Sequence, residues 1–147
     1  MKAAHPYLYF GGDAEEAFDF YRAVFGGQFA GVIRYRDFPG NPMGAPDDQL
    51  DRIAHIALPL GGTLLMGNDV FGAQRDALNI GNNAYISLEP ETAVEAGTVF
   101  SALSSQGRVH MPLQRTDWAE CFGMCSDQFG VQWMISYQGD VTFAFPG

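Results

Sequence analysis

Three histidines and two cysteines are the side chains of this sequence best suited to acid–base or nucleophilic chemistry. His55 lies in an apolar segment that ends at Gly61-Gly62, a pair typical of a two-residue hairpin turn. Such a turn places Ala57 opposite Met66 and His55 opposite Asn68, so all four side chains share one face. A neutral imidazole there can act as a general base or orient a bound anion. The alternative is a structural histidine bonded to Asn68, because no carboxylate is spaced to form a dyad with it.

Cys121 is the candidate nucleophile. A tight turn over residues 127–130 predicts that Gly123 faces Met134 and that Cys121 shares this ligand-facing side of the sheet. A slip of one residue would place the thiol behind the sheet. Cys121 and Cys125 have the spacing of neither a disulfide scaffold nor a C-x-x-C site, so two buried thiols on one strand face are the other reading.

An amide and two aromatic rings form the third candidate group. Gln114, Trp118 and Phe122 fall in the segment LQRTDWAECF, and an aromatic ring beside an amide can hold a planar ligand. Trp118 lies in a turn-like stretch, which favours a place in the pocket over a place in the core. Trp133 has the opposite strand parity to Met134 and is predicted to be a core residue.

These residues must be positioned by a repeated order of elements: one strand, one helix and three strands, found twice. The first helix is predicted to start with Asp13 as N-cap and Glu16 as its capping-box partner, and to end at Gly26. The predicted strands cover 6–10, 28–36, 52–60, 63–69, 84–88, 108–114, 120–126 and 131–137, and the helices cover 14–25 and 93–103. The loop over 37–49 is either a functional cover or a mobile surface excursion, and 71–82 is a polar linker.

The repeat predicts an α+β fold in which two βαβββ modules form half-barrels that together enclose a cup. We expect a single domain over residues 1–138, with module one at 6–69 and module two at 83–138. Residues 139–147 form a C-terminal tail, and Phe143 and Phe145 either cover a subunit interface or fray. Half-barrels leave apolar edges that one chain of this size covers poorly, so a homodimer is expected.

The charge balance excludes several classes of partner. Eight basic residues against 17 acidic ones give a net charge of -9, and Lys2 is the sole lysine. Nucleic acid and anionic membranes are therefore poor partners. No apolar run reaches the roughly 20 residues that span a bilayer, and no signal peptide is evident, so a cytoplasmic location is expected.

Three motifs together resemble a known family. The segments PYLYFGGDAEEAFDFYRAVFGG, IAHIALPLGGTLLMGND and VHMPLQRTDWAECFGMCSDQFGVQWMISY resemble the PhnB-like branch of the vicinal oxygen chelate superfamily, which includes glyoxalase I, bleomycin-resistance proteins and extradiol dioxygenases. The resemblance implies paired modules around a cavity and a homodimer. Some relatives carry the label of a 3-demethylubiquinone-9 3-methyltransferase, but no glycine-rich loop for S-adenosylmethionine follows a strand here.

The resemblance also implies where a divalent metal would bind. Metal enzymes of the superfamily place His or Gln on the first strand of each module and Glu on the last. The matching positions here are Pro6, residues 83–85, Met66 and Met134, which supply no carboxylate or imidazole. No metal and no other cofactor is therefore expected.

The first functional reading is a PhnB-like protein or enzyme of unknown substrate that binds an apolar or aromatic small molecule without a fixed metal. Its ligand-binding residues would be Met66, Asn68, Gln114, Trp118, Phe122 and Met134. One alternative is a metal-dependent lyase, isomerase or dioxygenase that uses displaced ligands such as His55, His5 or Glu120. Another is a resistance protein that sequesters a drug without turnover. The sequence leaves open whether the protein is an enzyme.

Overall fold

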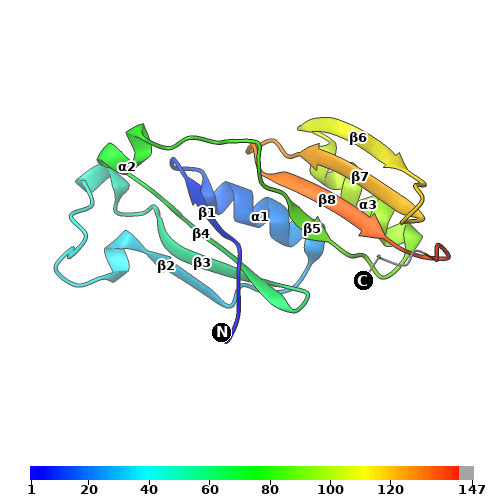
Figure 1. The fold of residues 1–147 in the computed structure, drawn as a ribbon. Coiled ribbons are helices and arrows are strands. Elements are labelled where there is room, and N and C mark those ends of the chain that lie inside the picture. The colour runs from blue at the N-terminus through cyan, green and yellow to red at the C-terminus, as the bar shows by residue number, and fades with distance from the viewer. Residues whose placement is uncertain (143–147) are drawn as a thin grey trace. The chain divides into compact units, whose positions relative to one another are not determined.

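The computed structural model describes residues 1–142, which lie in two compact units, one over Met1–Asn79 and one beginning at Ile80. Each unit has a four-stranded sheet of mixed direction with a long helix against one face (Figure 1). The predicted order of strand, helix and three strands occurs in both units, and the α+β class is confirmed. Phe143 and Phe145 of the predicted tail lie outside the described residues. The cup and the single domain over 1–138 stay predictions.

The first unit contains a sheet with the strand order β1-β4-β3-β2, in which β1 runs parallel to β4 and the other pairs are antiparallel. Its elements are β1 (Tyr7–Phe10), α1 (Ala14–Phe25), β2 (Gly31–Arg34), β3 (Ile53–Leu60), β4 (Thr63–Asp69) and α2 (Gly72–Asp76). Short 3₁₀ turns at Tyr35–Asp37 and Asp47–Gln49 interrupt the predicted loop, and α2 lies in the predicted linker.

The apolar stripe of α1 forms the core of the first unit with one face of the sheet. Phe18 and Tyr21 are fully buried, as are Leu58 and Leu65 on β3 and β4. The helix packs closely on Gly67, where an added Cβ would lie 3.0 Å from the Phe18 ring of α1 and 2.7 Å from the Leu8 carbonyl oxygen of β1. This side of the sheet is therefore closed by α1, and functional side chains must lie on the other.

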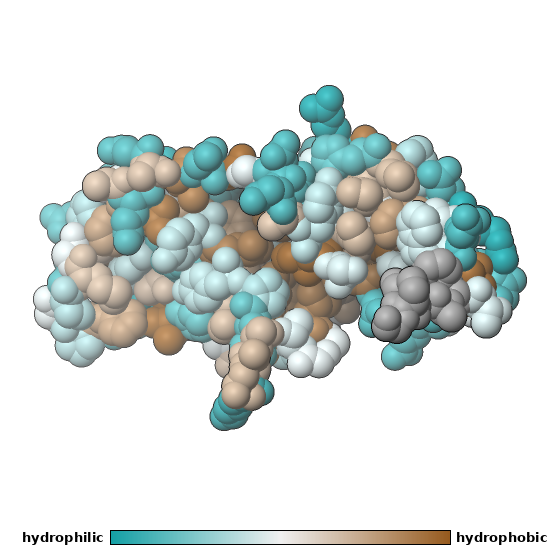
Figure 2. Space-filling view, in the orientation of Figure 1, coloured by the Kyte–Doolittle hydropathy of each residue, from teal (hydrophilic) through white to brown (hydrophobic). Residues whose placement is uncertain are grey.

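The face drawn in Figure 2 carries both hydrophobic and hydrophilic residues. Most large apolar side chains are buried, but Tyr7, Tyr9 and Trp118 keep 44%, 54% and 43% of their surface exposed. Tyr7 and Tyr9 lie side by side with ring centroids 6.0 Å apart, and contiguous exposed apolar surface can mark a binding site. Among the described residues, no helix is long and apolar enough to cross a membrane.

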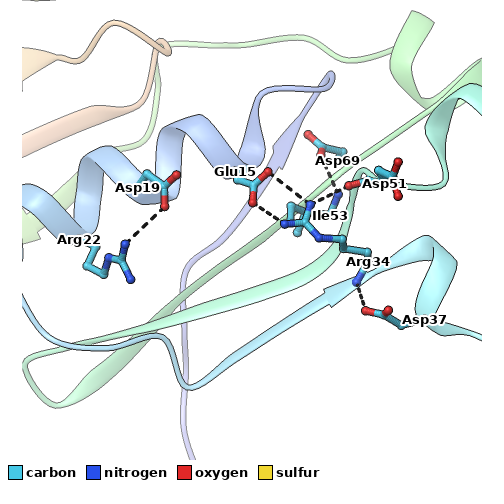
Figure 3. Close-up of polar contacts among 8 residues, drawn as sticks. All are labelled: Glu15, Asp19, Arg22, Arg34, Asp37, Asp51, Ile53 and Asp69. Carbon is cyan, nitrogen blue, oxygen red and sulfur yellow. Dashed lines mark hydrogen bonds and ion pairs between the residues drawn. The ribbon is translucent and has the colours of Figure 1, made fainter.

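Helix α1 begins without a side-chain cap from Asp13, so the predicted capping box of Asp13 and Glu16 is wrong. The cap comes from buried Asp69 at the end of β4, whose Oδ1 accepts the Ala14 N–H at 2.9 Å. Its Oδ2 accepts the Ile53 N–H at 2.9 Å (Figure 3). Tertiary structure thus supplies an acceptor that local spacing did not predict.

Exposed ion pairs hold the 3₁₀ turns and the loop after β2 (Figure 3). Arg34 binds Glu15 of α1 at 2.5 Å and donates its backbone N–H to Asp37. Its guanidinium also reaches the Asp51 carbonyl oxygen, and Arg36 pairs with the Asp51 carboxylate at 2.7 Å. The bond from Arg34 lowers the pKa of Glu15, and that from Arg36 lowers the pKa of Asp51. The loop is therefore anchored at both ends.

The second unit has the strand order β5-β8-β7-β6, with β5 parallel to β8 and the remaining pairs antiparallel. Its elements are β5 (Ile86–Leu88), α3 (Ala93–Ser104), β6 (Arg108–Gln114), β7 (Cys121–Ser126) and β8 (Gln132–Tyr137). The predicted bounds of β4 and β6 are confirmed, whereas β2 and β5 are shorter than predicted.

Trp133 lies in the core of the second unit, as predicted. It is fully buried with Cys125 and Ile135 on the side of the sheet that packs against α3. Its indole N–H donates to Asp127 Oδ2 at 2.9 Å, and Asp127 Oδ1 accepts the Phe129 N–H of the β7–β8 turn. Asp127 therefore links the turn to the buried tryptophan.

Candidate functional site

The face of the first sheet that points away from α1, called here the first open face, carries the predicted group around His55. The pairs Ala57–Met66 and Leu60–Thr63 confirm the predicted hairpin register, and continuing it brings His55 beside Asn68. The parallel strand β1 adds Tyr7 opposite Met66 and Tyr9 opposite Asn68. The two tyrosines were not singled out from the sequence, although their alternation in YLYF places them on one face.

His55 contacts Tyr7 across the first open face. The Tyr7 hydroxyl lies 3.3 Å from His55 Nδ1, and the two ring centroids are 5.8 Å apart. Burial, with the neighbouring Tyr9 and Tyr35, raises the pKa of Tyr7, so its hydroxyl is protonated at neutral pH and can donate to the imidazole. The predicted alternative paired His55 with Asn68, and the structure gives it Tyr7 instead. The pair can bind a polar group but has no carboxylate partner to act as a dyad.

Asn68 presents an acceptor without a hydrogen-bond donor. Its amide nitrogen donates to the Tyr35 hydroxyl at 3.3 Å and to the Asp69 carbonyl oxygen at 3.1 Å, while Oδ1 is buried and unpaired. Tyr35 donates its own proton to Asp69 O, so both partners of the amide nitrogen are acceptors and the amide orientation is determined. An unpaired buried oxygen costs about 1–3 kcal/mol, which a suitable donor would offset.

The second open face is the side of the second sheet away from α3, and it holds Met134 but not Cys121. Met134 pairs with Met124, and Ser126 pairs with Gln132, so the predicted pairing of Gly123 with Met134 is wrong by one residue. The cause is the turn, where the Asp127 N–H donates to Val131 O and Val131 belongs to the loop. Gly123 instead faces α3, where an added Cβ would lie 2.9 Å from the Phe100 ring.

Cys121 shares the parity of Gly123 and Cys125 and therefore lies on the α3 side of the sheet, behind the second open face. Burial, with a contribution from Glu120, raises its pKa, and burial raises that of Cys125 to about 11. Both thiols are thus largely protonated at neutral pH, when they are poor nucleophiles. The structure does not favour the nucleophile role predicted for Cys121.

An aromatic pair lies at one end of the second open face. The rings of Trp118 and Phe122 meet edge to face at 5.2 Å, and Gln114 is the strand partner of Phe122. Trp118 is held in its turn by the Thr116 hydroxyl, which accepts the Trp118 N–H at 3.3 Å. The three predicted ligand-binding residues of this group are therefore neighbours, with the indole exposed.

The residues at the superfamily's metal positions do not fit a divalent ion. The strand partner of Met66 is Tyr7, one residue beyond the predicted Pro6, and the partner of Met134 is Ser87, two beyond the predicted residues 83–85. A phenol, a hydroxyl and two thioethers are a weak donor set for such ions. Within residues 1–142, no three His, Cys, Asp or Glu side chains are grouped to hold a metal.

His5 has a structural role in the first unit. Its Nδ1 accepts the Leu64 N–H at 3.0 Å and lies 2.8 Å from the Thr63 hydroxyl, so it ties the N-terminal segment to the β3–β4 turn. Glu120, another displaced-ligand candidate, accepts the Asp140 N–H in the second unit. Neither lies beside His55 in a group that could hold an ion.

Both the sequence and the fold of this chain are similar to those of known proteins. Protein PA1353 from Pseudomonas aeruginosa is 35% identical, with a TM-score of 0.79 over 94% of this chain and 98% of that one. A PhnB protein from Bacillus cereus, described as a putative 3-demethylubiquinone-9 3-methyltransferase, is 26% identical, with a TM-score of 0.69 over 92% and 99% of the chains. Protein YjdN of Escherichia coli is 26% identical over 89% of this chain and 92% of its own.

One protein-family model matches almost the whole of the two repeated modules. Residues 3–135 match the family model described as the Glyoxalase/Bleomycin resistance protein/Dioxygenase superfamily. That range includes the predicted module one, 6–69, and all but the last three residues of module two, 83–138. The chain belongs to the glyoxalase/bleomycin resistance/dioxygenase superfamily, and PhnB-like proteins are among its structural neighbours.

Proposed function

We propose that this protein binds a planar, apolar or aromatic small molecule on its open sheet faces without a divalent metal. The observation that carries the proposal is the composition of those faces. Met66, Tyr7 and Tyr9 lie on one, and Met134 lies on the other with the exposed Trp118. Thioethers and aromatic rings give an adaptable apolar surface for planar molecules.

Polar groups on the same faces would orient the ligand. The Tyr7–His55 pair offers an exchangeable proton, Gln114 offers an amide beside the aromatic pair, and Asn68 holds a buried acceptor oxygen that has no donor. A few polar groups within an apolar surface are typical of small-molecule sites. A planar molecule with at least one hydrogen-bond donor therefore matches these faces best.

The proposal is tested by calorimetric titration of the purified chain with neutral heteroaromatic molecules that carry an N–H donor, such as indole, against saturated ring analogues of similar size. We expect the aromatic series to bind and to raise the melting temperature. Trp118→Ala should weaken binding by roughly two- to tenfold, since an aromatic contact contributes about 0.5–1.5 kcal/mol. Absence of any aromatic binding would overturn the proposal.

Val94→Ala is the matched control, because Val94 lies on α3 and is also highly exposed. It removes apolar surface away from both open faces and should leave affinity unchanged. Equal losses for Trp118→Ala and Val94→Ala would assign the effect to general stability.

Two other functions predict different results from the same protein. A metal-dependent lyase, isomerase or dioxygenase would carry stoichiometric Zn, Ni, Mn or Fe after purification without a chelating tag. A sequestering resistance protein would bind an aromatic drug tightly and release it chemically unchanged. The second is the stronger alternative, because within residues 1–142 no three His, Cys, Asp or Glu side chains are grouped to hold a metal.

The homodimer and the cytoplasmic location belong to this proposal as well. Each sheet has two edge strands, β1 and β2 in the first unit and β5 and β6 in the second. Exposed edges are commonly covered by another chain. Cell fractionation tests the location.

A further inference from the structure

Three of the six methionines of this chain form a row across the second open face. Met111 of β6 pairs with Met124 of β7, and Met124 pairs with Met134 of β8. The strands are neighbours in the sheet, so the three side chains are directly adjacent. All three are half-buried, which leaves their thioethers accessible from the open side.

A β-bulge brings Met111 into this row. Val109 pairs with Cys125 on the α3 side, and regular alternation would place Met111 on that side too. The register shifts between Val109 and Met111, so that Met111 pairs with Met124 and His110 is the extra residue. Bulges re-aim side chains and occur often beside functional sites.

The bulge also brings an imidazole to the row. The ring of His110 meets the ring of Tyr85 edge to face at 6.4 Å, and Tyr85 precedes by two residues Ser87, the strand partner of Met134. Tyr85 therefore has the parity of the second open face, and its contact places His110 over that face. His110 is exposed, so a ring nitrogen can reach a ligand.

The spacing of the strands allows the donors to converge. Neighbouring strands lie about 4.8 Å apart, and opposed residues have Cα atoms roughly 4.5–5.5 Å apart. Methionine is unbranched and has three rotatable side-chain bonds, so the outer two thioethers can turn towards Met124. His110 follows Val109 directly beside Met111 and approaches from the same edge.

Three thioethers and one imidazole bind some metal ions in preference to others. Thioethers are soft, neutral donors that select monovalent Cu(I), whereas imidazole also suits copper. Calcium, magnesium and manganese prefer oxygen donors, and no carboxylate belongs to this group. The net charge of -9 also favours approach of a cation.

We propose that His110, Met111, Met124 and Met134 form a binding site for a soft monovalent cation, Cu(I) or its chemical analogue Ag(I). This site shares Met134 with the superfamily's divalent metal positions but differs from them in its other three residues and in the metal it takes. It goes beyond the binding of an aromatic molecule, although Met134 belongs to both.

The test is a titration of the full chain, labelled with ¹³C at the methionine methyl groups, with Ag(I) in chloride-free buffer. We expect the methyl signals of Met111, Met124 and Met134 to shift together and to saturate near one equivalent. Met66 on the first open face and Met43 in the exposed loop are internal controls and should not shift. No shift in the three signals, or equal shifts in all methionines, would overturn the proposal.

Leucine substitutions separate the two proposals, because Met→Leu keeps apolar volume and removes the sulfur. Met124→Leu should weaken Ag(I) binding at least tenfold and leave heteroaromatic binding within twofold, whereas Met66→Leu should leave Ag(I) binding unchanged. Titrations in a Cys121→Ser background exclude binding by that thiol. Loss of the methyl shifts in this background would assign the cation to the cysteine and overturn the proposal.

Discussion

At the scale of single residues, chemistry here depends on what surrounds each polar group. Asp69 is buried and accepts the backbone N–H groups of Ala14 and Ile53. Asn68, the next residue along β4, has an oxygen without a partner. One carboxylate therefore stabilises the fold, while the neighbouring amide leaves a buried acceptor oxygen unpaired.

Asp69→Asn is expected to lower the free energy of unfolding by about 1–3 kcal/mol, since one carboxylate oxygen becomes an N–H donor facing another donor. Denaturant unfolding at neutral pH measures this loss. Asp76→Asn at the end of the exposed helix α2 is the control and should change stability by less than about 0.5 kcal/mol.

The difference in stability between the native protein and Asp69→Asn should depend on pH. Burial raises the pKa of Asp69 above its usual value, despite the bonds from Ile53 and Ala14. A raised pKa in the folded state means that its stabilising contribution is complete at low pH and declines as the pH rises through the folded-state pKa. The advantage of the native protein over Asp69→Asn should therefore shrink from acidic towards neutral pH. An advantage that grows with pH would show that the pKa is lowered instead.

Cys125 is expected to resist thiol reagents in the folded protein. With a pKa of about 11, its thiolate fraction at pH 8 is roughly a hundredfold below that of a free cysteine. In a Cys121→Ser variant, the remaining thiol should react with dithionitrobenzoate only after denaturation. Rapid labelling of the native variant would contradict its burial against α3.

At the scale of elements, the two units share one arrangement of helix and sheet but cap their helices differently. Helix α1 is capped from a distant strand, whereas α3 is capped locally by Thr92, whose hydroxyl accepts the Glu95 N–H at 3.0 Å. Each helix closes one face of its sheet and leaves the other face open. Glycines at the helix–sheet contacts allow the close approach.

Gly123→Ala is expected to destabilise the second unit by about 1–3 kcal/mol, because the new methyl group would lie 2.9 Å from the Phe100 ring and 3.1 Å from Leu113 Cα. Gly97→Ala on α3 is the matched control, since no atom lies within 4 Å of its added Cβ. It should stabilise the helix by about 0.5–1 kcal/mol. Thermal unfolding of both variants checks the two signs, and a tolerated Gly123→Ala would contradict the packing.

At the scale of the whole molecule, the repeated unit places most of the residues proposed to bind a ligand on sheets, with Trp118 in the turn between β6 and β7. Each open face is a rigid platform on which side chains alternate with those of the core. The functional residues named here lie on strands or directly beside them.

The protein is expected to have twice the 16.0 kDa chain mass in solution at micromolar concentration. The four edge strands of its two sheets are the physical reason, because a second copy can cover them. Light scattering after size-exclusion chromatography measures the mass. A monomeric mass would contradict the proposed homodimer.

The sequence by itself determined the repeated element order, the β3–β4 register and the core role of Trp133. These depend on local signals: periodicity, the Gly61-Gly62 turn and strand parity. Only the tertiary structure decided that Asp69 caps α1, that Cys121 lies behind the sheet and that Met111 joins the methionine row. A cap from 55 residues away, a one-residue shift at a turn and a β-bulge each depend on contacts between distant segments, which local patterns do not encode.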